Sequence, residues 1–201
     1  ETLKKSLKYS LSAKDSSIAY NNVSYVFDLE ENEDSSIFYS QKALRHAERS
    51  RDSALLITSW HNLSLHFSSY GHIDSAMIYA RKTIQHSTPQ LKGCSKYYSH
   101  LGEIYADKEN KDSAIYYLDK GLSFPNAPIS IYRILSDLEN KSKHYQIAYF
   151  YLNTYVTRLD SFISQKGVTE IQHLIYKHQT EMNVKEEQNR YKRFIGYFIF
   201  L

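Results

Sequence analysis

The histidine, cysteine and carboxylate side chains are the groups in this sequence that could do chemistry, and their spacing favours neither catalysis nor metal binding. The nine histidines include no pair at i, i+4 and no His-Glu-x-x-His sequence, the spacings that place two zinc ligands on one helix face. Cys94 is a lone cysteine, which favours a packed small residue over a nucleophile. Glu30, Glu31 and Glu33 fall in a short polar stretch, where solvated carboxylates are expected rather than an acid–base pair. We therefore predict no metal and no catalytic residue.

Loops that would hold a phosphate or activate a serine do not occur either. The sequence contains no G-x-G-x-x-G, no Walker loop and no G-x-S-x-G. Lys and Arg number 25 against 22 Asp and Glu, a net charge of +3 that is too even for a concentrated nucleic-acid-binding face. The expectation is a protein that is not an enzyme, needs no cofactor and binds no nucleic acid through this segment.

The composition favours helices as the elements that position whatever site exists. A chain of 201 residues with 42% hydrophobic residues is enough for one domain or one short repeat array. Its 6 glycines and 3 prolines leave little of the punctuation that hairpin turns and α/β loops need. We therefore predict an all-α fold.

An internal repeat gives that fold its organisation. Four segments share an aromatic residue, an apolar residue three positions later and a small residue directly after it. They are Tyr20-Val23-Ser24, Trp60-Leu63-Ser64, Tyr98-Leu101-Gly102 and Tyr132-Leu135-Ser136. Sixteen residues after each leading aromatic residue stands another small residue, and three further on a tyrosine. These pairs are Ser36 and Tyr39, Ala76 and Tyr79, Ala114 and Tyr117, and Ala148 and Tyr151.

The spacing of these residues predicts two helices per repeat. Positions three and four apart share one helix face, and a small residue there lets a second helix approach closely. Short polar stretches separate the two helices of each pair, and aspartates follow at the expected helix starts. We predict that these aspartates cap helices and complement their positive ends. They are Asp15, Asp34, Asp52, Asp74 and Asp112.

In these residues the sequence resembles the tetratricopeptide repeat (TPR), whose signature is W-x2-L-G-x2-Y followed by A-x3-F. The resemblance covers roughly residues 15–165, and Glu139 replaces the usual aromatic residue in the fourth repeat. It implies a right-handed TPR-like helical-hairpin solenoid of about four repeats, followed by a long C-terminal helix. It also implies binding of a protein or peptide ligand in a concave groove.

The first helix of each repeat is expected to line that groove. Positions one, two and five after the leading aromatic residue should then face the ligand. The groove candidates are Asn21, Asn22, Tyr25, His61, Asn62, Leu65, Ser99, His100, Glu103, Arg133, Ile134 and Asp137.

The two ends of the sequence suggest further segments. Residues 1–14 are interpreted as the remnant of a preceding repeat helix, and 15–165 as the array. Residues 168–193 are expected to form a stalk or capping helix, through which the chain could also form a homodimer. The apolar run 194–201 is read as the start of a transmembrane helix or, alternatively, as a terminal helix that packs on its own domain.

Two functional hypotheses follow. The first is the sensor or scaffold part of a bacterial membrane-associated signalling or regulatory protein, similar to the TPR regions of Bacteroidetes membrane-tethered sensors and transcriptional regulators. In that case the array is periplasmic or cytoplasmic, and the basic residues before position 194 favour the cytoplasmic side. The second is a soluble intracellular peptide-binding receptor or adaptor.

Overall fold

The regular structure of this protein is helical. The computed structural model describes residues 12–88 and 93–169, and every regular element within them is a helix. The chain divides into two compact units, unit 1 at Glu1–Leu152 and unit 2 at Asn153–Leu201. The prediction of an all-α fold built from helical hairpins is confirmed over the described residues.

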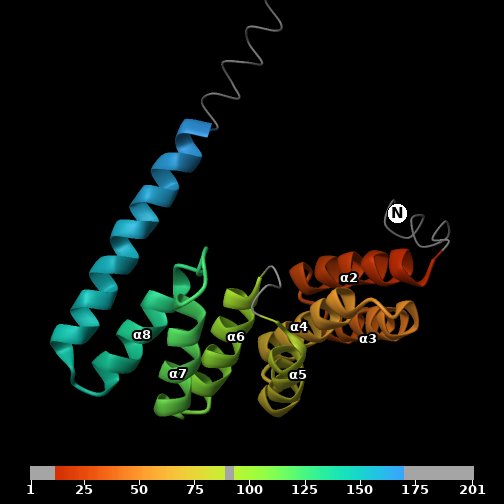
Figure 1. Cartoon of the computed structure of the whole chain (residues 1–201), viewed down its shortest axis with the longest axis horizontal. Coiled ribbons are helices and arrows are strands. Elements are labelled where there is room, and N and C mark those ends of the chain that lie inside the picture. The colour runs from red at the N-terminus through yellow and green to blue at the C-terminus, as the bar shows by residue number, and fades with distance from the viewer. Residues whose placement is uncertain (1–11, 89–92, 170–201) are drawn as a thin grey trace, which may run out of the picture. The chain divides into compact units, whose positions relative to one another are not determined.

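Unit 1 consists of consecutive helical hairpins (Figure 1). The helices are α2 (Ala13–Leu29), α3 (Glu33–Ser50), α4 (Ser53–Ser69), α5 (Ile73–His86), α6 (Cys94–Asp107), α7 (Lys111–Leu122) and α8 (Ser130–Lys141). Residues 145–169 are helical as well. Each leading aromatic residue of the repeat lies in α2, α4, α6 or α8, which we call the first helices. We call α3, α5 and α7 the second helices.

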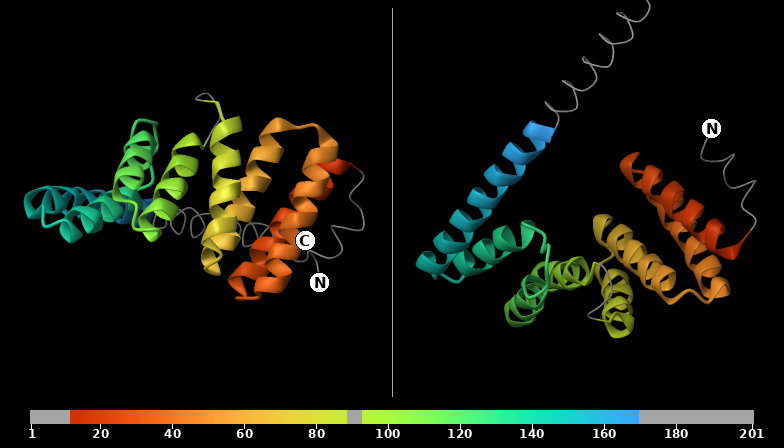
Figure 2. Two further views of the ribbon diagram at one scale, coloured as in Figure 1. Left: turned by 90° about the horizontal axis from the view of Figure 1, so that it is seen from below. Right: turned by 45° about the horizontal axis from the view of Figure 1, so that its top comes forward.

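The packing of the helices distinguishes the two sides of unit 1. Each first helix contacts the second helix that follows it, and each second helix contacts the next first helix (Figure 1; Figure 2). Successive first helices also contact one another, from α2 to α4, α6 and α8. The second helices make no contact with one another. The first helices therefore form the closely spaced side of unit 1, which is the side that lines the inner face of a helical-hairpin array.

Stacked aromatic rings hold each of the first three hairpins together. The ring seven positions after the leading aromatic residue stacks on the repeat tyrosine of the second helix. The pairs are Phe27–Tyr39 at 5.3 Å, Phe67–Tyr79 at 5.7 Å and Tyr105–Tyr117 at 5.3 Å between ring centroids. In the fourth repeat Glu139 occupies this position and its carboxylate instead contacts Lys111 Nζ at 3.0 Å and His144 Nδ1 at 2.6 Å.

The small residue of the first helix is required by the close approach of the two helices. Gly102 lies so near Leu118 that a Cβ at this position would be 2.7 Å from Leu118 Cγ. In two other repeats the position is a serine whose hydroxyl donates to a carbonyl of the second helix, Ser64 to Ala76 and Ser136 to Ala148, each at 2.8 Å. The hydroxyl therefore uses the short interhelical distance to make a buried hydrogen bond.

The turn inside each hairpin repeats the same backbone conformation. The residue eleven positions after the leading aromatic residue has a positive φ in every repeat: Glu31 (55°), Gly71 (79°), Glu109 (57°) and Lys143 (63°). The next residue's N–H donates to the carbonyl of the residue at the stacking position, as His72 does to Phe67 at 2.8 Å. This is the left-handed ending that terminates many helices, and it favours glycine.

The predicted helix caps are correct at Asp52 and wrong at the four other aspartates. Asp52 caps α4 by accepting a hydrogen bond from Leu55 N. Ser12, Asn32 and Asn110 cap α2, α3 and α7 in the same way, whereas His72 begins α5 with no side-chain cap. The other aspartates lie inside the first turn, where they complement the positive helix end without capping it. They are Asp15, Asp34, Asp74 and Asp112.

Unit 1 ends at Leu152, before position 165, at which the sequence resemblance places the end of the array. Residues 153–169 of unit 2 are helical, with exposed apolar side chains such as Phe162 and Ile163. Within residues 12–88 and 93–169, no helix combines the length and the apolar character that a bilayer crossing requires. The predictions for residues 1–11, for 170–193 and for the apolar run 194–201 lie outside the described residues.

Candidate functional site

Polar side chains join the first helices of successive repeats. Asn21 Nδ2 on α2 lies 3.3 Å from Ser59 Oγ on α4, and Asn62 Nδ2 donates to Asn21 Oδ1 at 3.2 Å. Asn21 is 8% exposed, so these hydrogen bonds satisfy a buried amide. The position one residue after the leading aromatic in one repeat thus meets the position two residues after it in the next.

The same register brings two buried histidines together between α4 and α6. The ring of His61 lies 5.6 Å from the ring of His100 and 4.8 Å from that of Tyr97. His100 Nε2 is 2.9 Å from Ser64 Oγ, whereas its Nδ1 is 3.6 Å from Glu103 Oε2, too long for a hydrogen bond. The polar groups of this joint are therefore only partly satisfied.

The buried setting of His61 keeps its ring neutral. Burial lowers the pKa of His61 well below its ordinary value of 6.5, and the neighbouring His100 and Lys96 lower it further. A protonated imidazole here would be a desolvated cation next to two other basic groups. His61 thus lies in an interface between repeats that favours its uncharged form.

The predicted groove candidates divide into buried and accessible residues. Those within the packed first-helix face are Asn21, His61, Ser99, His100 and Ile134, each at most 9% exposed. Those that reach the surface or lie half-buried are Asn22, Tyr25, Asn62, Leu65, Glu103, Arg133 and Asp137. The position five residues after the leading aromatic residue is accessible in every repeat.

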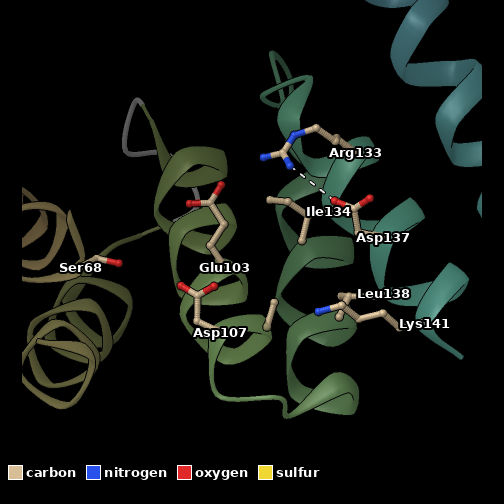
Figure 3. A pocket seen from close by; sticks show the side chains of 9 residues that line it. Ser68, Glu103, Asp107, Arg133, Ile134, Asp137, Leu138 and Lys141 are labelled. Atoms are coloured by element: carbon tan, nitrogen blue, oxygen red, sulfur yellow. Dashed lines mark hydrogen bonds and ion pairs between the residues drawn. The ribbon is translucent and has the colours of Figure 1, made fainter. Parts of the chain in front are cut away.

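A pocket of about 310 Å³ opens on the first-helix side of unit 1 (Figure 3). It is formed by α4, α6 and α8, each the first helix of its repeat. The lining residues are Ser68, Glu103, Ala106, Asp107, Arg133, Ile134, Asp137, Leu138 and Lys141. The structure therefore brings the predicted residues Glu103, Arg133 and Asp137 into one cavity, together with Ile134. All predicted residues of α2 and α4, and Ser99 and His100 of α6, lie outside it.

The walls of the pocket carry different charges. Glu103 and Asp107 project from α6, and the Arg133 guanidinium extends from α8 toward them (Figure 3). Arg133 Nη1 also lies 3.4 Å from Asp137 Oδ2, a contact between exposed side chains that stabilises little by itself. Asp107 and Lys141 are exposed charges on opposite walls. The pocket can thus offer a carboxylate to a cation on one side and an ammonium to an anion on the other.

Sequence reasoning missed Asp107 and Lys141, although a signal for them exists. Asp107 is four residues after Glu103, and Lys141 is four residues after Asp137, so each continues the same helix face by one turn. The residue four positions after the accessible position of a first helix could therefore have been predicted to face the same side. The lining also includes the apolar side chains of Ala106, Ile134 and Leu138.

The described residues offer no arrangement suited to metal chemistry. Within residues 12–88 and 93–169, no group of three or more His, Cys, Asp or Glu side chains is placed to hold an ion. Cys94 is buried, and its Sγ lies 2.8 Å from the carbonyl of Thr88.

Comparison with known proteins places the fold. No family model and no curated protein sequence matches the chain. Among solved structures, MamA aligns with a TM-score of 0.61 at 15% identity, covering 81% of this chain and 87% of that one. PilF of Pseudomonas aeruginosa aligns with a TM-score of 0.63 at 20% identity over 77% of this chain and 65% of its own.

A third similar structure carries the repeat name itself. The nearly identical TPR-like repeats of a kinesin light chain from Podosopora anserina align with a TM-score of 0.60 at 10% identity, covering 77% of this chain and 81% of that one. Such identities show a shared fold rather than a shared ligand. With its repeated hairpins, stacked rings and closely spaced first helices, the chain has a TPR-like fold.

Proposed function

We propose that unit 1 is a non-catalytic module that binds a peptide segment of another protein on its first-helix side. The observation that carries this proposal is the pocket of about 310 Å³ formed by three successive first helices, which is lined by charged side chains and by the apolar residues Ala106, Ile134 and Leu138. Its volume lies at the lower end of ligand-binding pockets, about 300–1,000 Å³. It suits one or two side chains of a peptide better than a large cofactor.

The charges of the pocket indicate the chemistry of the peptide. Glu103 and Asp107 on α6 suit a lysine or arginine side chain, and Lys141 on α8 suits a carboxylate or a main-chain carbonyl. The apolar surface of Ala106 and Leu138 between them suits an aliphatic stem. We therefore propose a peptide with a basic residue close to an acidic one.

A random peptide library displayed on phage and selected on the full chain tests this function. The Asp107→Asn and Lys141→Gln variants should each weaken binding of the selected peptides by about two- to five-fold, the effect of losing an exposed charge pair. Asp160→Asn, at an exposed position outside the pocket, is the matched control and should bind as the wild type does. Selected peptides whose affinity is the same for all these proteins would contradict the proposed site.

The cellular context is a finer proposal that rests on the sequence. We propose a membrane-associated sensor or scaffold of bacterial signalling or transcription regulation, supported by the basic residues Arg190, Lys192 and Arg193 that precede the apolar run 194–201. Fractionation of cells that express the chain tests it, since recovery entirely in the soluble fraction would favour the alternative, a soluble peptide-binding adaptor.

A further inference from the structure

The outer side of the second helices carries the same three residue types at the same spacing. Each second helix has an aspartate, a large apolar residue four positions later and a lysine four positions after that. These sets are Asp34, Phe38 and Lys42 in α3, Asp74, Ile78 and Lys82 in α5, and Asp112, Tyr116 and Lys120 in α7. The three types thus recur at equivalent positions of successive second helices, and we call them the acidic row, the apolar row and the basic row.

The apolar row faces away from the core. In α3 the buried residues are Ser36, Ser40, Ala43 and Ala47. Phe38 stands two positions after Ser36, about 200° around the helix. Phe38, Ile78 and Tyr116 are 49%, 56% and 57% exposed, although the rings of Phe38 and Tyr116 also contact those of Tyr39 and Tyr117 edge-on. Large apolar residues at one exposed position in three successive repeats are a marker of an interaction surface.

The two charged positions flank the apolar position on each second helix. Lys42 Nζ lies 4.4 Å from the centre of the Phe38 ring, so this ammonium group borders the apolar row. The aspartates also complement the positive ends of their helices, which explains the acidic row in part. Lys42 lies in the middle of α3, so an interaction with a helix end does not explain it.

The width of the three rows matches one helix. The aspartate and the lysine of each set are eight residues apart, which is about 12 Å along the helix axis. An α-helix with its side chains is about 10–12 Å in diameter. An extended strand, which occupies about 5 Å beside its neighbours, would leave both charged rows uncovered.

We propose that this surface binds a single amphipathic helix of another protein, which lies across α3, α5 and α7. Its apolar stripe covers Phe38, Ile78 and Tyr116, and acidic side chains on one flank meet the basic row. Basic side chains on the other flank meet Asp34 and Asp112 and compete with Lys108 for Asp74, which Lys108 Nζ contacts at 2.7 Å. The fourth repeat keeps an exposed apolar residue, Phe150 at 63%, but has Gln146 where the others have an aspartate. The charged footprint therefore spans three repeats.

Designed peptides test the proposal on the full chain. The probe is an amphipathic helical peptide of about 20 residues, roughly 30 Å long, with a leucine stripe, lysines on one flank and glutamates on the other. Two comparison peptides carry lysines on both flanks or glutamates on both flanks. Fluorescence anisotropy should show the mixed peptide binding about ten-fold more tightly than either comparison peptide, because each of those meets one row of like charge.

Substitutions in the rows make the test specific. The triple variant Phe38→Ser, Ile78→Ser, Tyr116→Ser should lose at least about ten-fold in affinity for the mixed peptide. Its helicity should be unchanged by circular dichroism, since the three positions are exposed. Phe162→Ser, at a 58% exposed position in unit 2, is the matched control and should bind normally.

Reversing the charge of the basic row should change which peptide the chain prefers, rather than only weaken binding. With Lys42→Glu, Lys82→Glu and Lys120→Glu combined, both rows are acidic, and the preference should move to the peptide with lysines on both flanks. Equal affinity of the wild type for the three peptides, or full binding by the triple serine variant, would overturn the proposal. So would a dimer of the chain that the triple serine variant dissociates, since a second copy would then occupy the rows. The pocket variants Asp107→Asn and Lys141→Gln should leave this binding unchanged, which separates it from the first-helix site.

Discussion

Ser64 Oγ donates a 2.8 Å hydrogen bond to the main-chain carbonyl of Ala76, so a side chain of one helix is fixed to the backbone of its hairpin partner. The same oxygen lies 2.9 Å from His100 Nε2 in the next repeat. Ser136 makes the equivalent bond to Ala148, also at 2.8 Å. Ser64 therefore joins the two helices of its own hairpin and connects that hairpin to its neighbour.

Replacing Ser64 by alanine should destabilise the protein more than the same change at Ser136. Ser64→Ala removes the second hydrogen bond of the Ala76 carbonyl, which keeps its bond within α5, and leaves the buried Nε2 of His100 without a partner. It should lower the free energy of unfolding by about 1–3 kcal/mol. Urea denaturation followed by circular dichroism measures both variants. Equal losses would show that the contact with His100 contributes nothing.

Gly102→Ala should destabilise unit 1 by overpacking. The added methyl group would lie 2.7 Å from Leu118 Cγ and 3.2 Å from the Leu118 main-chain nitrogen, so the second helix has to move. The expected cost is about 1–3 kcal/mol of unfolding free energy, measured in the same way. Gly167→Ala is the control, because nothing lies within 4 Å of its added Cβ. A stability of Gly102→Ala equal to that of the wild type would mean that the hairpin is looser than described.

The stability of the protein should fall in mild acid because of His61. Burial, His100 and Lys96 lower the pKa of His61 below 6.5, so near that pH the unfolded chain binds a proton that the folded chain does not. Stability is therefore full above the unfolded pKa and is lost as the pH falls below it. Thermal melts between about pH 8 and pH 5 should show a falling Tm, and His61→Gln should flatten this dependence.

The neighbouring Asn62 supplies the control for this pH dependence. Its amide donates to Asn21 Oδ1 at 3.2 Å and does not titrate. Asn62→Ser should therefore retain the slope of the wild type between mild acid and neutral pH. A slope that persists in His61→Gln would show that another group causes the effect.

The stacked rings should contribute a measurable part of hairpin stability. The rings of Phe67 and Tyr79 are 8° from parallel with centroids 5.7 Å apart. Phe67→Leu keeps an apolar side chain and removes the stack, and should cost about 0.5–1.5 kcal/mol in thermal or urea unfolding. Phe162→Leu, at a position that is 58% exposed, should cost less. A larger loss of stability in Phe162→Leu than in Phe67→Leu would show that the stacked rings do not stabilise the hairpin.

The hairpins were predictable because their packing residues recur at fixed spacing. The residues at which the helices begin were not predictable. Sequence reasoning placed caps on aspartates, but Asn32 and Asn110 stand two residues before the predicted ones and take the cap position first. Asn is as good a cap as Asp. A short polar stretch with several capping residues does not by itself reveal which one lies at the helix start.

The candidate site was predictable in part, for a geometric reason. Counting from the leading aromatic residue identifies the face of the first helix that points away from the second helix. Glu103 and Asp137 lie on that face and line the pocket. The same count includes His61 and His100, which pack between successive first helices. Which residues of that face are buried depends on the distance between successive first helices. The sequence of a single repeat does not determine this distance.

The left-handed turn residues have a consequence for how such a chain can evolve. Glu31, Gly71, Glu109 and Lys143 share one backbone conformation, although their side chains have little in common. The bend is thus set by the main chain and the flanking helices rather than by a particular amino acid. Whole hairpins could be gained, lost or exchanged by recombination without altering how each one folds, and the length of the molecule could change in steps of one repeat.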